Sequence, residues 1–482
     1  MEFEFSEESY EEMLSELFVR FPSFQKSGVS AYKPGIGNME HADMLLGHPH
    51  SGYRIIHVAG TNGKGSVSNM LASCLAAAGL RVGLYTSPHI LDFRERIRLV
   101  TSSFGQGNAA VSEMIPKKDV WSFVMQWREM FDRLDLSFFE ITTLMALDWF
   151  SCRCADVVVL ETGLGGRLDS TNIVTPVLSV ITNVGLDHCD LLGGTLPEIA
   201  FEKAGIIKQG VPVVIGESDP ETDRIFERKV MYVNSSRSEL MAGRNPLQDF
   251  LTYADKVSPS LWEIHQDILQ EMDLKGEYQR KNLRTVLVTM DVLMSGNLMY
   301  SPQNPAFILP RAEMKDALVH AAERTGFRGR WEKISDDPYV ICDIGHNEHG
   351  LKYNFAQLSG IMKKGVFTHL IMVYGSVADK DVDSVLHIFP SADVCIFTQA
   401  QGKRALSAEK ICDKFLDFCR RTGRHEGKVK CAATVSEAVS MAYAIASDLK
   451  MKDASSRPYI YIGGSTYVVS EAIAAAEANA GS

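Results

Sequence analysis

The sequence predicts an α/β protein in which each of two domains contains a parallel sheet covered by helices. Five short apolar runs in the first half lie at residues 54–60, 81–87, 156–163, 177–184 and 211–217. Consecutive apolar positions are typical of strands that are buried on both faces of a parallel sheet. Helical patterns separate these runs, so the first half predicts a doubly wound sheet.

A second series of strands is predicted at residues 339–345, 368–375, 393–399 and 459–465, with helical stretches at 407–421 and 435–449. A Pro- and Asn-bearing stretch at 297–313 precedes it, followed by a short helical segment that ends near Gly326. Such a break in pattern is typical of a domain junction. We therefore expect a first domain at 1–325 and a smaller second domain at 326–482. The order of elements between 216 and 278 does not emerge from the pattern.

Composition excludes several classes of protein. The 482 residues carry a net charge of -11 without a long basic run, which argues against a nucleic-acid partner. No uninterrupted apolar run reaches about 18 residues, so we expect no membrane span. The acidic start, MEFEFSEESYEEMLSELF, does not resemble a targeting peptide, and we expect a cytoplasmic protein. The nine cysteines show neither a disulfide framework nor a C-x-x-C metal pattern, which favours reduced thiols.

A glycine-rich stretch, HVAGTNGKGS at 57–66, follows the first strand and opens a helical pattern. It departs from the usual phosphate-loop spacing, because two residues separate Gly60 from Gly63 and Gly65 intervenes between Lys64 and Ser66. A helix N-terminus offers free N–H groups to an anion, and glycine lets the backbone approach it closely. We therefore expect polyphosphate binding, with Lys64 as the counter-charge. The residues of this cradle are Thr61, Asn62, Gly63, Lys64, Gly65 and Ser66.

A carboxylate, Glu161, ends the apolar run at 156–163. Open α/β sheets place ligands at the carboxyl ends of their strands, and Mg²⁺ prefers oxygen ligands. Glu161 is therefore the first candidate metal ligand.

Eight stretches in one order together resemble a known family. They are HVAGTNGKGS, LYTSPHILDFRERIR, SFFEITT, LETGLGGRLDSTN, DHCDLLGGTLPEIAFEKAGIIK, GRWE, DIGHN and YGSVADKD. They resemble the folylpolyglutamate synthase and dihydrofolate synthase family, whose members are related to the Mur ligases. The resemblance spans nearly the whole chain. It implies a Mur-ligase-like P-loop ATP-binding catalytic domain followed by a smaller, Rossmann-like α/β glutamate-ligase domain.

The resemblance implies an ATP-dependent ligase that adds L-glutamate to dihydropteroate and to the γ-glutamyl tails of tetrahydrofolate. A carboxylate takes the γ-phosphoryl group of ATP to form an acyl phosphate, and the amine of glutamate then displaces phosphate. This chemistry needs a phosphate cradle, cations and Mg²⁺, for which two sites are expected, but no Ser/His/Asp nucleophile. The partners are then the small-molecule substrates alone, and we expect a monomer.

The resemblance also implies site residues around the metal. Ser87 of TSPH and His188 of DHCDLLG would join Glu161, and a lone histidine would otherwise be an ordinary loop residue. Lys203 of EKAGIIK would be carbamylated and so become an anionic ligand, which requires a neutral amine and hence a lowered pKa. Without the resemblance, Lys203 beside Glu202 would be interpreted as a surface ion pair. The catalytic set is Lys64, His188, Lys203 and His346.

Substrate-binding residues are expected in both halves. Phe138 and Phe139 could stack on a pterin while Asp169 and Ser170 bind its polar edge, although aromatic pairs are more often core residues. The LDSTN form resembles bifunctional members more than those that only extend folate.

By resemblance, Asn282, Arg330 and Asp343 bind ATP, and His346 and Arg404 suit phosphate or glutamate. The departures from the family pattern are Ile344, the missing Pro after Asn347 and the missing His before Gln279.

Three alternatives stand beside this hypothesis. A Mur peptide ligase would carry a further N-terminal domain, whereas only 56 residues precede His57. A non-catalytic nucleotide-binding protein would need the loop but neither Lys203 nor His188. A monofunctional folylpolyglutamate synthase would only extend folate tails, and such members often carry a different residue pair before the Asp of LDSTN.

Overall fold

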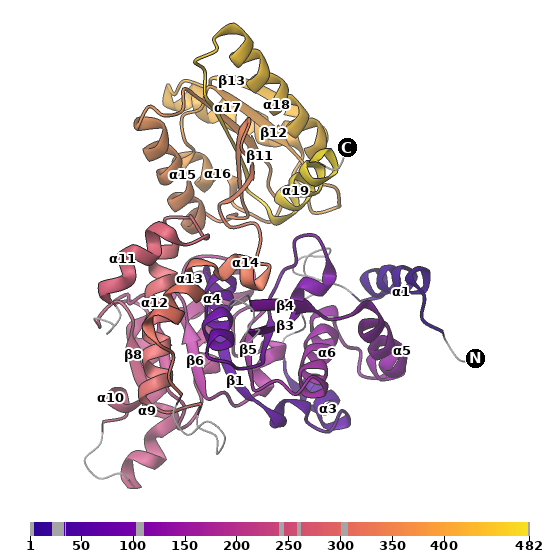
Figure 1. Ribbon diagram of the computed structural model, residues 1–482, viewed down its shortest axis with the longest axis vertical. Coiled ribbons are helices and arrows are strands. Elements are labelled where there is room, and N and C mark those ends of the chain that lie inside the picture. Colours follow the sequence, from indigo (N-terminus) through magenta and orange to yellow (C-terminus); the bar gives the residue numbers. More distant parts are fainter. Residues whose placement is uncertain are drawn as a thin grey trace. The chain divides into compact units, whose positions relative to one another are not determined.

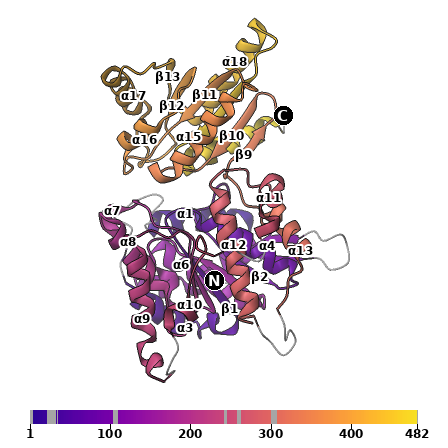
Figure 2. The same ribbon diagram turned by 90° about the vertical axis from the view of Figure 1, so that its left-hand side faces the viewer.

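The computed structural model describes residues 4–21, 33, 35–102, 110–240, 245–257, 262–299 and 307–480. The chain forms two compact units (Figures 1 and 2). The first unit runs to Asp273 and resumes at Gln279–Phe327, and the second takes Leu274–Tyr278 and the chain from Arg328 onward. The short excursion at 274–278 into the second unit has no signal in the sequence. Of the stretch at 297–313, residues 300–306 lie outside the described residues.

The first unit is built on a sheet whose described strands follow the order β4-β3-β2-β5-β1-β6-β7-β8. The strands are β1 (Arg54–Ala59), β2 (Val82–Tyr85), β3 (Ile97–Ser102), β4 (Ala110–Met114), β5 (Val157–Glu161), β6 (Leu178–Ile181), β7 (Val213–Ile215) and β8 (Leu251–Tyr253). In the part of this order that runs β2-β5-β1-β6-β7-β8, every pair of neighbouring strands is parallel. At the other end of the sheet, β3 pairs antiparallel with both β2 and β4. The five apolar runs are β1, β2, β5, β6 and β7, and the predicted doubly wound sheet is confirmed.

Helices cover both faces of this sheet (Figure 1). They are α1 (Glu7–Arg20), α3 (Gly37–Leu45), α4 (Lys64–Ala77), α5 (Lys117–Arg133), α6 (Phe138–Cys152), α7 (Cys189–Leu192), α8 (Leu196–Lys203), α9 (Asp223–Leu240), α10 (Pro246–Phe250), α11 (Trp262–Glu271), α12 (Gln279–Ser295), α13 (Arg311–Val319) and α14 (Ala321–Thr325). Short 3-10 turns η2 (Pro49–Gly52), η3 (Phe93–Arg96), η4 (Ser170–Ile173) and η5 (Ala204–Ile206) complete the unit. Helix α4 packs on one face beneath α12, α13 and α14, and α5 and α6 share a core with the other face.

Helix α4 explains how the sequence positions the phosphate loop. It begins after Gly63, whose φ of +84° is easy only for glycine, and its residues Gly65–Ala76 are buried. The helix ends where Gly79, at φ +85°, donates its N–H to the carbonyl of Ala76. The strand, glycine turn and helix predicted from the sequence are therefore present.

The second unit has a sheet whose described strands follow the order β13-β12-β11-β14-β10-β9. The strands are β9 (Glu332–Ser335), β10 (Tyr339–Asp343), β11 (His369–Tyr374), β12 (Val394–Thr398), β13 (Lys428–Ala432) and β14 (Pro458–Gly463), and the helices are α15 (Glu348–Lys363), α16 (Val382–Ile388), α17 (Ala408–Thr422), α18 (Val435–Lys452) and α19 (Thr466–Ala480). All pairs are parallel except β9 with β10. The four predicted strands are present. The sequence pattern missed β9 and β13, because these edge strands carry charged residues and almost all of their residues are at least partly exposed.

Within the described residues, we find no helix that combines the length and the apolar character required to cross a bilayer.

Candidate active site

The phosphate loop between β1 and α4 is fixed by the chain that follows β6. The N–H of Thr61 donates to the carbonyl of Asn183 at 3.0 Å, and the N–H of Asn62 donates to the Asn183 side chain at 3.0 Å. The hydroxyl of Thr182 donates to the carbonyl of Asn62 at 2.6 Å. Because Asn183 already accepts the first two N–H groups, the groups left for an anion are those of the first turn of α4, which have no partner within a helix.

Two glycines of the loop cannot be replaced without rearrangement. A Cβ on Gly60 would lie 1.8 Å from the Thr182 hydroxyl, and a Cβ on Gly63 would lie 2.3 Å from the Asn282 side-chain oxygen. Both glycines also have positive φ values. Asn282, predicted to bind ATP, therefore lies directly against the phosphate loop.

Helix α12 closes over the loop through buried amide side chains. Gln279 donates its amide to the hydroxyl of Ser66 at 3.1 Å and accepts from the amide of Asn282 at 2.8 Å. Gln279 was not predicted as a site residue. Its place one helical turn before Asn282 was the only signal in the sequence.

The Lys64 side chain folds back over the loop. Its ammonium donates to the carbonyl of Gly60 at 3.0 Å and to that of Thr61 at 3.4 Å, and the side chain is partly exposed. Lys64 therefore places a positive charge at the loop beside the first turn of α4. A bound polyphosphate would receive both the charge and the free N–H groups.

The predicted metal ligands lie at the carboxyl edge of the sheet. Glu161 ends β5 and is 2% exposed, and its carboxylate accepts the N–H of Ser87 at 3.2 Å. His188 follows β6 in a left-handed conformation, with its Nε2 3.9 Å from the Asp187 carboxylate. The structure brings Ser87 and Glu161 together and gives His188 an acidic neighbour.

These donors suit a hard cation. Across the part of the chain that the structure describes, no group of three or more His, Cys, Asp or Glu side chains is arranged to hold a metal ion. The predicted set has only two such side chains, so Mg²⁺ would need the Ser87 hydroxyl, phosphate oxygens and water as well. Mg²⁺ commonly keeps phosphate and water ligands, and the buried Glu161 carboxylate fits this role.

Lys203 is the last residue of α8 and is only 2% exposed. Its neighbour Glu202 pairs instead with Arg167, at 2.8 Å. The surface ion pair that the sequence alone suggested is therefore wrong. Burial, together with the positive charge of Lys64, lowers the pKa of Lys203 to about 7, although Asp187 opposes this change.

Asp169 organises the loop that it occupies. Its carboxylate accepts the N–H of Leu164 at 2.7 Å, the N–H of Thr171 at 3.0 Å and the hydroxyl of Thr171 at 2.6 Å. It also caps η4, in which Ser170 is partly exposed. Burial raises the pKa of Asp169. This shaping of the loop is a second task for a residue predicted only as a pterin ligand.

His57 connects that loop to β1. Its Nε2 lies 2.8 Å from the Thr171 hydroxyl, which itself donates to Asp169. The hydroxyl must therefore accept from His57, and this assigns the imidazole proton to Nε2. Burial lowers the pKa of His57 to about 3. The sequence analysis had not given His57 a role.

The two phenylalanines of SFFE have different surroundings. Phe138 is 2% exposed, stacks on Phe18 at 5.0 Å and lies 5.4 Å from the guanidinium of Arg96. For Phe138 the core alternative therefore holds, because its faces are already covered. Phe139 is partly exposed, and a Cβ on Gly163 would be 2.5 Å from its ring. Phe139 is the member of the pair that remains a candidate for pterin stacking.

In the second unit, Asp343 ends β10 as a saturated hydrogen-bond acceptor. Its carboxylate accepts the hydroxyl of Tyr278 at 2.7 Å and the N–H of Trp331 at 2.8 Å. It also accepts the N–H of Gly345 at 2.8 Å and the amide of Asn354 at 2.7 Å. Asp343 therefore holds together the segments that surround it.

The other predicted residues of this unit lie nearby in the chain or on a separate loop. Arg330 directly precedes Trp331, which Asp343 binds, and His346 has its Nδ1 3.0 Å from the carbonyl of Ile344. Arg404 follows β12 and pairs with Asp379 at 2.5 Å. The structure thus gathers Arg330, Asp343 and His346 at one end of β10, whereas Arg404 belongs to a different connection.

The fold and this site define an ATP-dependent ligase of the Mur type. Residues 329–451 match the family described as Mur ligase, glutamate ligase domain.

Curated and structural relatives narrow the class. The dihydrofolate synthase/folylpolyglutamate synthase of Bacillus subtilis is 34% identical over 366 residues, which cover 73% of this chain and 78% of the relative. The folylpolyglutamate synthase of Lacticaseibacillus casei is 34% identical over 350 residues, covering 70% and 74%. The structure of the Mycobacterium tuberculosis folylpolyglutamate synthase complexed with ADP is 25% identical and covers 98% of each chain with a TM-score of 0.74. The chain belongs to the dihydrofolate synthase/folylpolyglutamate synthase family.

Replacing Lys64 with alanine should lower kcat by about a hundredfold or more, because a charged donor at a transferring phosphoryl group contributes most in the transition state. The melting temperature should stay close to that of the wild type, since Lys64 bonds only carbonyls of its own loop. Steady-state phosphate release and thermal melting measure both effects. Lys118→Ala, an exposed lysine of α5, is the control. An unchanged kcat in Lys64→Ala would contradict the prediction that this loop binds phosphate.

His57 should make the protein less stable in acid. Its pKa is about 3 in the folded protein and about 6.5 in an unfolded chain. Between these values the unfolded chain binds a proton that the folded protein does not, so stability falls as pH decreases from about 6.5 towards 3. His57→Gln keeps a donor for Thr171 without this titration. Urea unfolding at pH 7 and pH 5 should therefore show a smaller pH effect in His57→Gln than in the control His41→Gln, an exposed position of α3.

Proposed function

We propose that the protein is an ATP-dependent ligase that adds L-glutamate to dihydropteroate and to the γ-glutamyl tails of reduced folates. The observation that carries this proposal is the carboxyl edge of the first sheet, where the phosphate loop, the buried Glu161 and the buried Lys203 belong to one unit. Family membership supplies the chemistry, since the relatives are named for glutamate ligation to folates.

The reaction consumes one ATP per amide bond. The substrate carboxylate attacks the γ-phosphorus, ADP leaves, and an acyl phosphate forms. The amine of glutamate then attacks the acyl carbon and loses a proton, and phosphate leaves with the bonding electrons. Lys64 and the first N–H groups of α4 would neutralise the transferring phosphoryl group.

Mg²⁺ bound by Ser87, Glu161 and His188 would neutralise phosphate charge in this reaction. A second Mg²⁺ site would use Lys203 as a carbamate. Because the pKa of Lys203 is about 7, about half of its amines are neutral at pH 7, against about one in 2,500 for an ordinary lysine. The neutral amine attacks carbon dioxide and loses a proton, which leaves an anion in place of a cation. Formation of the carbamate therefore requires carbon dioxide in the medium.

We assign the remaining residues to the two units separately. In the first unit, Phe139 and Ser170 would contact the pterin, and Asn282 would contact ATP at the phosphate loop. Asp169 would shape the pterin loop as well as bind the ligand.

In the second unit, Arg330 would bind the nucleotide, and Asp343 would fix its position through the N–H of Trp331. His346 and Arg404 would receive phosphate or the incoming glutamate. We further propose that the protein acts as a monomer in the cytoplasm. Light scattering on the purified chain would test the monomeric state.

We further propose that the protein acts on both dihydropteroate and folate tails. A relative named for both activities and one named for folate extension alone are equally similar at 34% identity. The LDSTN stretch, which resembles that of bifunctional members, favours the dual form.

Incubation with ATP, Mg²⁺, glutamate and either dihydropteroate or tetrahydrofolate should give a product larger by one glutamyl unit from each substrate. Mass spectrometry of the products measures both reactions. A product from tetrahydrofolate but not from dihydropteroate would favour the monofunctional synthase. Phosphate release that does not depend on glutamate, with no product, would instead favour a nucleotide-binding protein without ligase activity.

Lys203→Ala should reduce kcat by about tenfold to a hundredfold, the usual loss when support around a metal is removed. Acetate or formate should restore part of the rate, because a small carboxylate can take the vacated place. Lys208→Ala is a matched control, since Lys208 lies in the same motif, is partly buried and also has a lowered pKa. Full activity of Lys203→Ala, or equal rescue of Lys208→Ala by acetate, would contradict the carbamate.

A further inference from the structure

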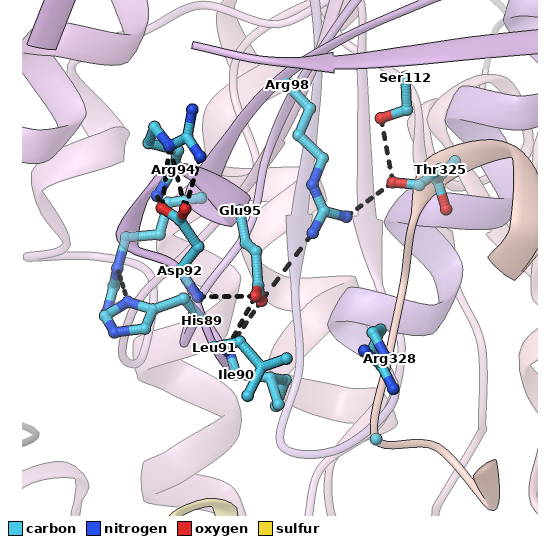
Figure 3. Close-up of polar contacts among 12 residues, drawn as sticks. His89, Ile90, Leu91, Asp92, Arg94, Glu95, Arg98, Ser112, Thr325 and Arg328 are labelled. Carbon is cyan, nitrogen blue, oxygen red and sulfur yellow. Dashed lines mark hydrogen bonds and ion pairs between the residues drawn. The ribbon is translucent and has the colours of Figure 1, made fainter. Parts of the chain in front are cut away.

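The loop between β2 and β3, residues 86–96, is built around a single carboxylate (Figure 3). Glu95 accepts the N–H of Ile90 at 2.7 Å with one oxygen. Its other oxygen accepts the N–H of Leu91 at 2.8 Å and that of Asp92 at 2.9 Å. Three consecutive N–H groups thus converge on one side chain. The bond from Asp92 belongs to an ordinary capping box of η3, but those from Ile90 and Leu91 extend beyond it.

Glu95 in turn meets a buried arginine from β3. The guanidinium of Arg98 lies 3.9 Å from the Glu95 carboxylate, and only 5% of the Arg98 side chain is exposed. A buried charge is costly unless it is paired and hydrogen-bonded. Arg98 satisfies this need with Glu95 on one side and with a backbone carbonyl on the other.

That carbonyl belongs to Thr325, the last residue of α14. Arg98 donates to it at 2.7 Å, and the hydroxyl of Ser112 donates to it at 3.1 Å (Figure 3). The first unit ends two residues later, at Phe327. The end of the first unit is therefore held by the same guanidinium that pairs with the loop.

The other end of the loop reaches the predicted metal site. Ser87, its second residue, donates its N–H to the buried carboxylate of Glu161 at 3.2 Å. The N–H of Thr86 donates to the carbonyl of Arg96 at 3.0 Å and closes the loop. A continuous series of contacts therefore runs from the Thr325 carbonyl through Arg98 and Glu95 to the chain that carries Ser87.

We propose that Glu95 and Arg98 are positioning residues that hold loop 86–96 in the shape that presents Ser87 beside Glu161. The anchor of this arrangement is the Thr325 carbonyl, so the same contacts tie the loop to the end of the first unit. Neither residue needs to touch a substrate. The inference rests on the proposed ligase function for its catalytic consequence, but the shape of the loop can be measured without activity.

Hydrogen exchange tests the shape of the loop directly. Glu95→Gln replaces one acceptor oxygen by a donor group, so the N–H groups of Ile90, Leu91 and Asp92 should exchange about tenfold faster or more. Arg94→Met is the matched control, because Arg94 lies on the same turn and pairs with Asp92 but makes no bond to Glu95. Unchanged exchange in Glu95→Gln, or equal acceleration in Arg94→Met, would overturn the proposal.

Kinetics tests the link to the active site. Arg98→Met should raise the Mg²⁺ concentration for half-maximal rate by about tenfold, whereas the KM for ATP at saturating Mg²⁺ should change by less than about twofold. Arg98→Lys keeps a donor for Thr325 and should recover part of the Mg²⁺ response.

A purely structural role for Arg98 predicts a different result. It would lower the melting temperature and reduce kcat in step with the folded fraction, with no separate change in the Mg²⁺ response. That outcome would overturn the proposal. If wild-type protein shows no ligase activity, the proposed function fails, while the exchange experiment still decides whether Glu95 holds the loop.

Discussion

The parallel register of β1 between β5 and β6 is the constraint on which the rest of the active site depends. Val58 pairs with Glu161 on one side, and Ala59 pairs with Ile181 on the other. The ladder continues past the strand ends, where the N–H of Thr182 donates to the carbonyl of Ala59 at 2.9 Å. The phosphate loop, the predicted metal carboxylate and the chain that fixes the loop therefore leave the sheet at the same edge. A shift of this register would separate all three.

This edge brings charged side chains of both signs close together. Burial and the positive charge of Lys64 lower the pKa of Lys203, and the nearby carboxylates of Asp187 and Asp169 do not cancel the effect. An anion such as a polyphosphate would relieve this repulsion between like charges. The chain as a whole carries a net charge of -11, so the positive charge at this edge is a local feature. The same burial and neighbouring positive charge explain why Lys203 gives up its proton more readily than an ordinary lysine.

Carboxylates shape three of the loops that matter. Asp169, Asp343 and Glu95 each accept three or more hydrogen bonds from backbone or side-chain donors around them. Most of these donors are backbone N–H groups at loops and turns, and only a few are side chains such as the amide of Asn354 in α15. A buried carboxylate satisfies several such donors at once, which costs less than leaving them unpaired. Loss of one of these residues would therefore disturb a whole loop rather than a single contact.

The sequence by itself determined the two α/β units, the main parallel strands and the phosphate loop, because apolar periodicity and glycine spacing are local properties of the chain. The edge strands β9 and β13 escaped prediction, since partly exposed strands with charged residues lack that apolar signal. Sequence could not distinguish a core ring from a ligand-facing one, and only packing showed that Phe138 is covered whereas Phe139 is partly open. It could not show that Lys203 is buried and that Glu202 pairs with Arg167 instead. Nor could it join Glu95 and Arg98 to Thr325, more than two hundred residues away. Burial and long-range pairing decide these roles, and they exist only when distant segments have been brought together by the fold.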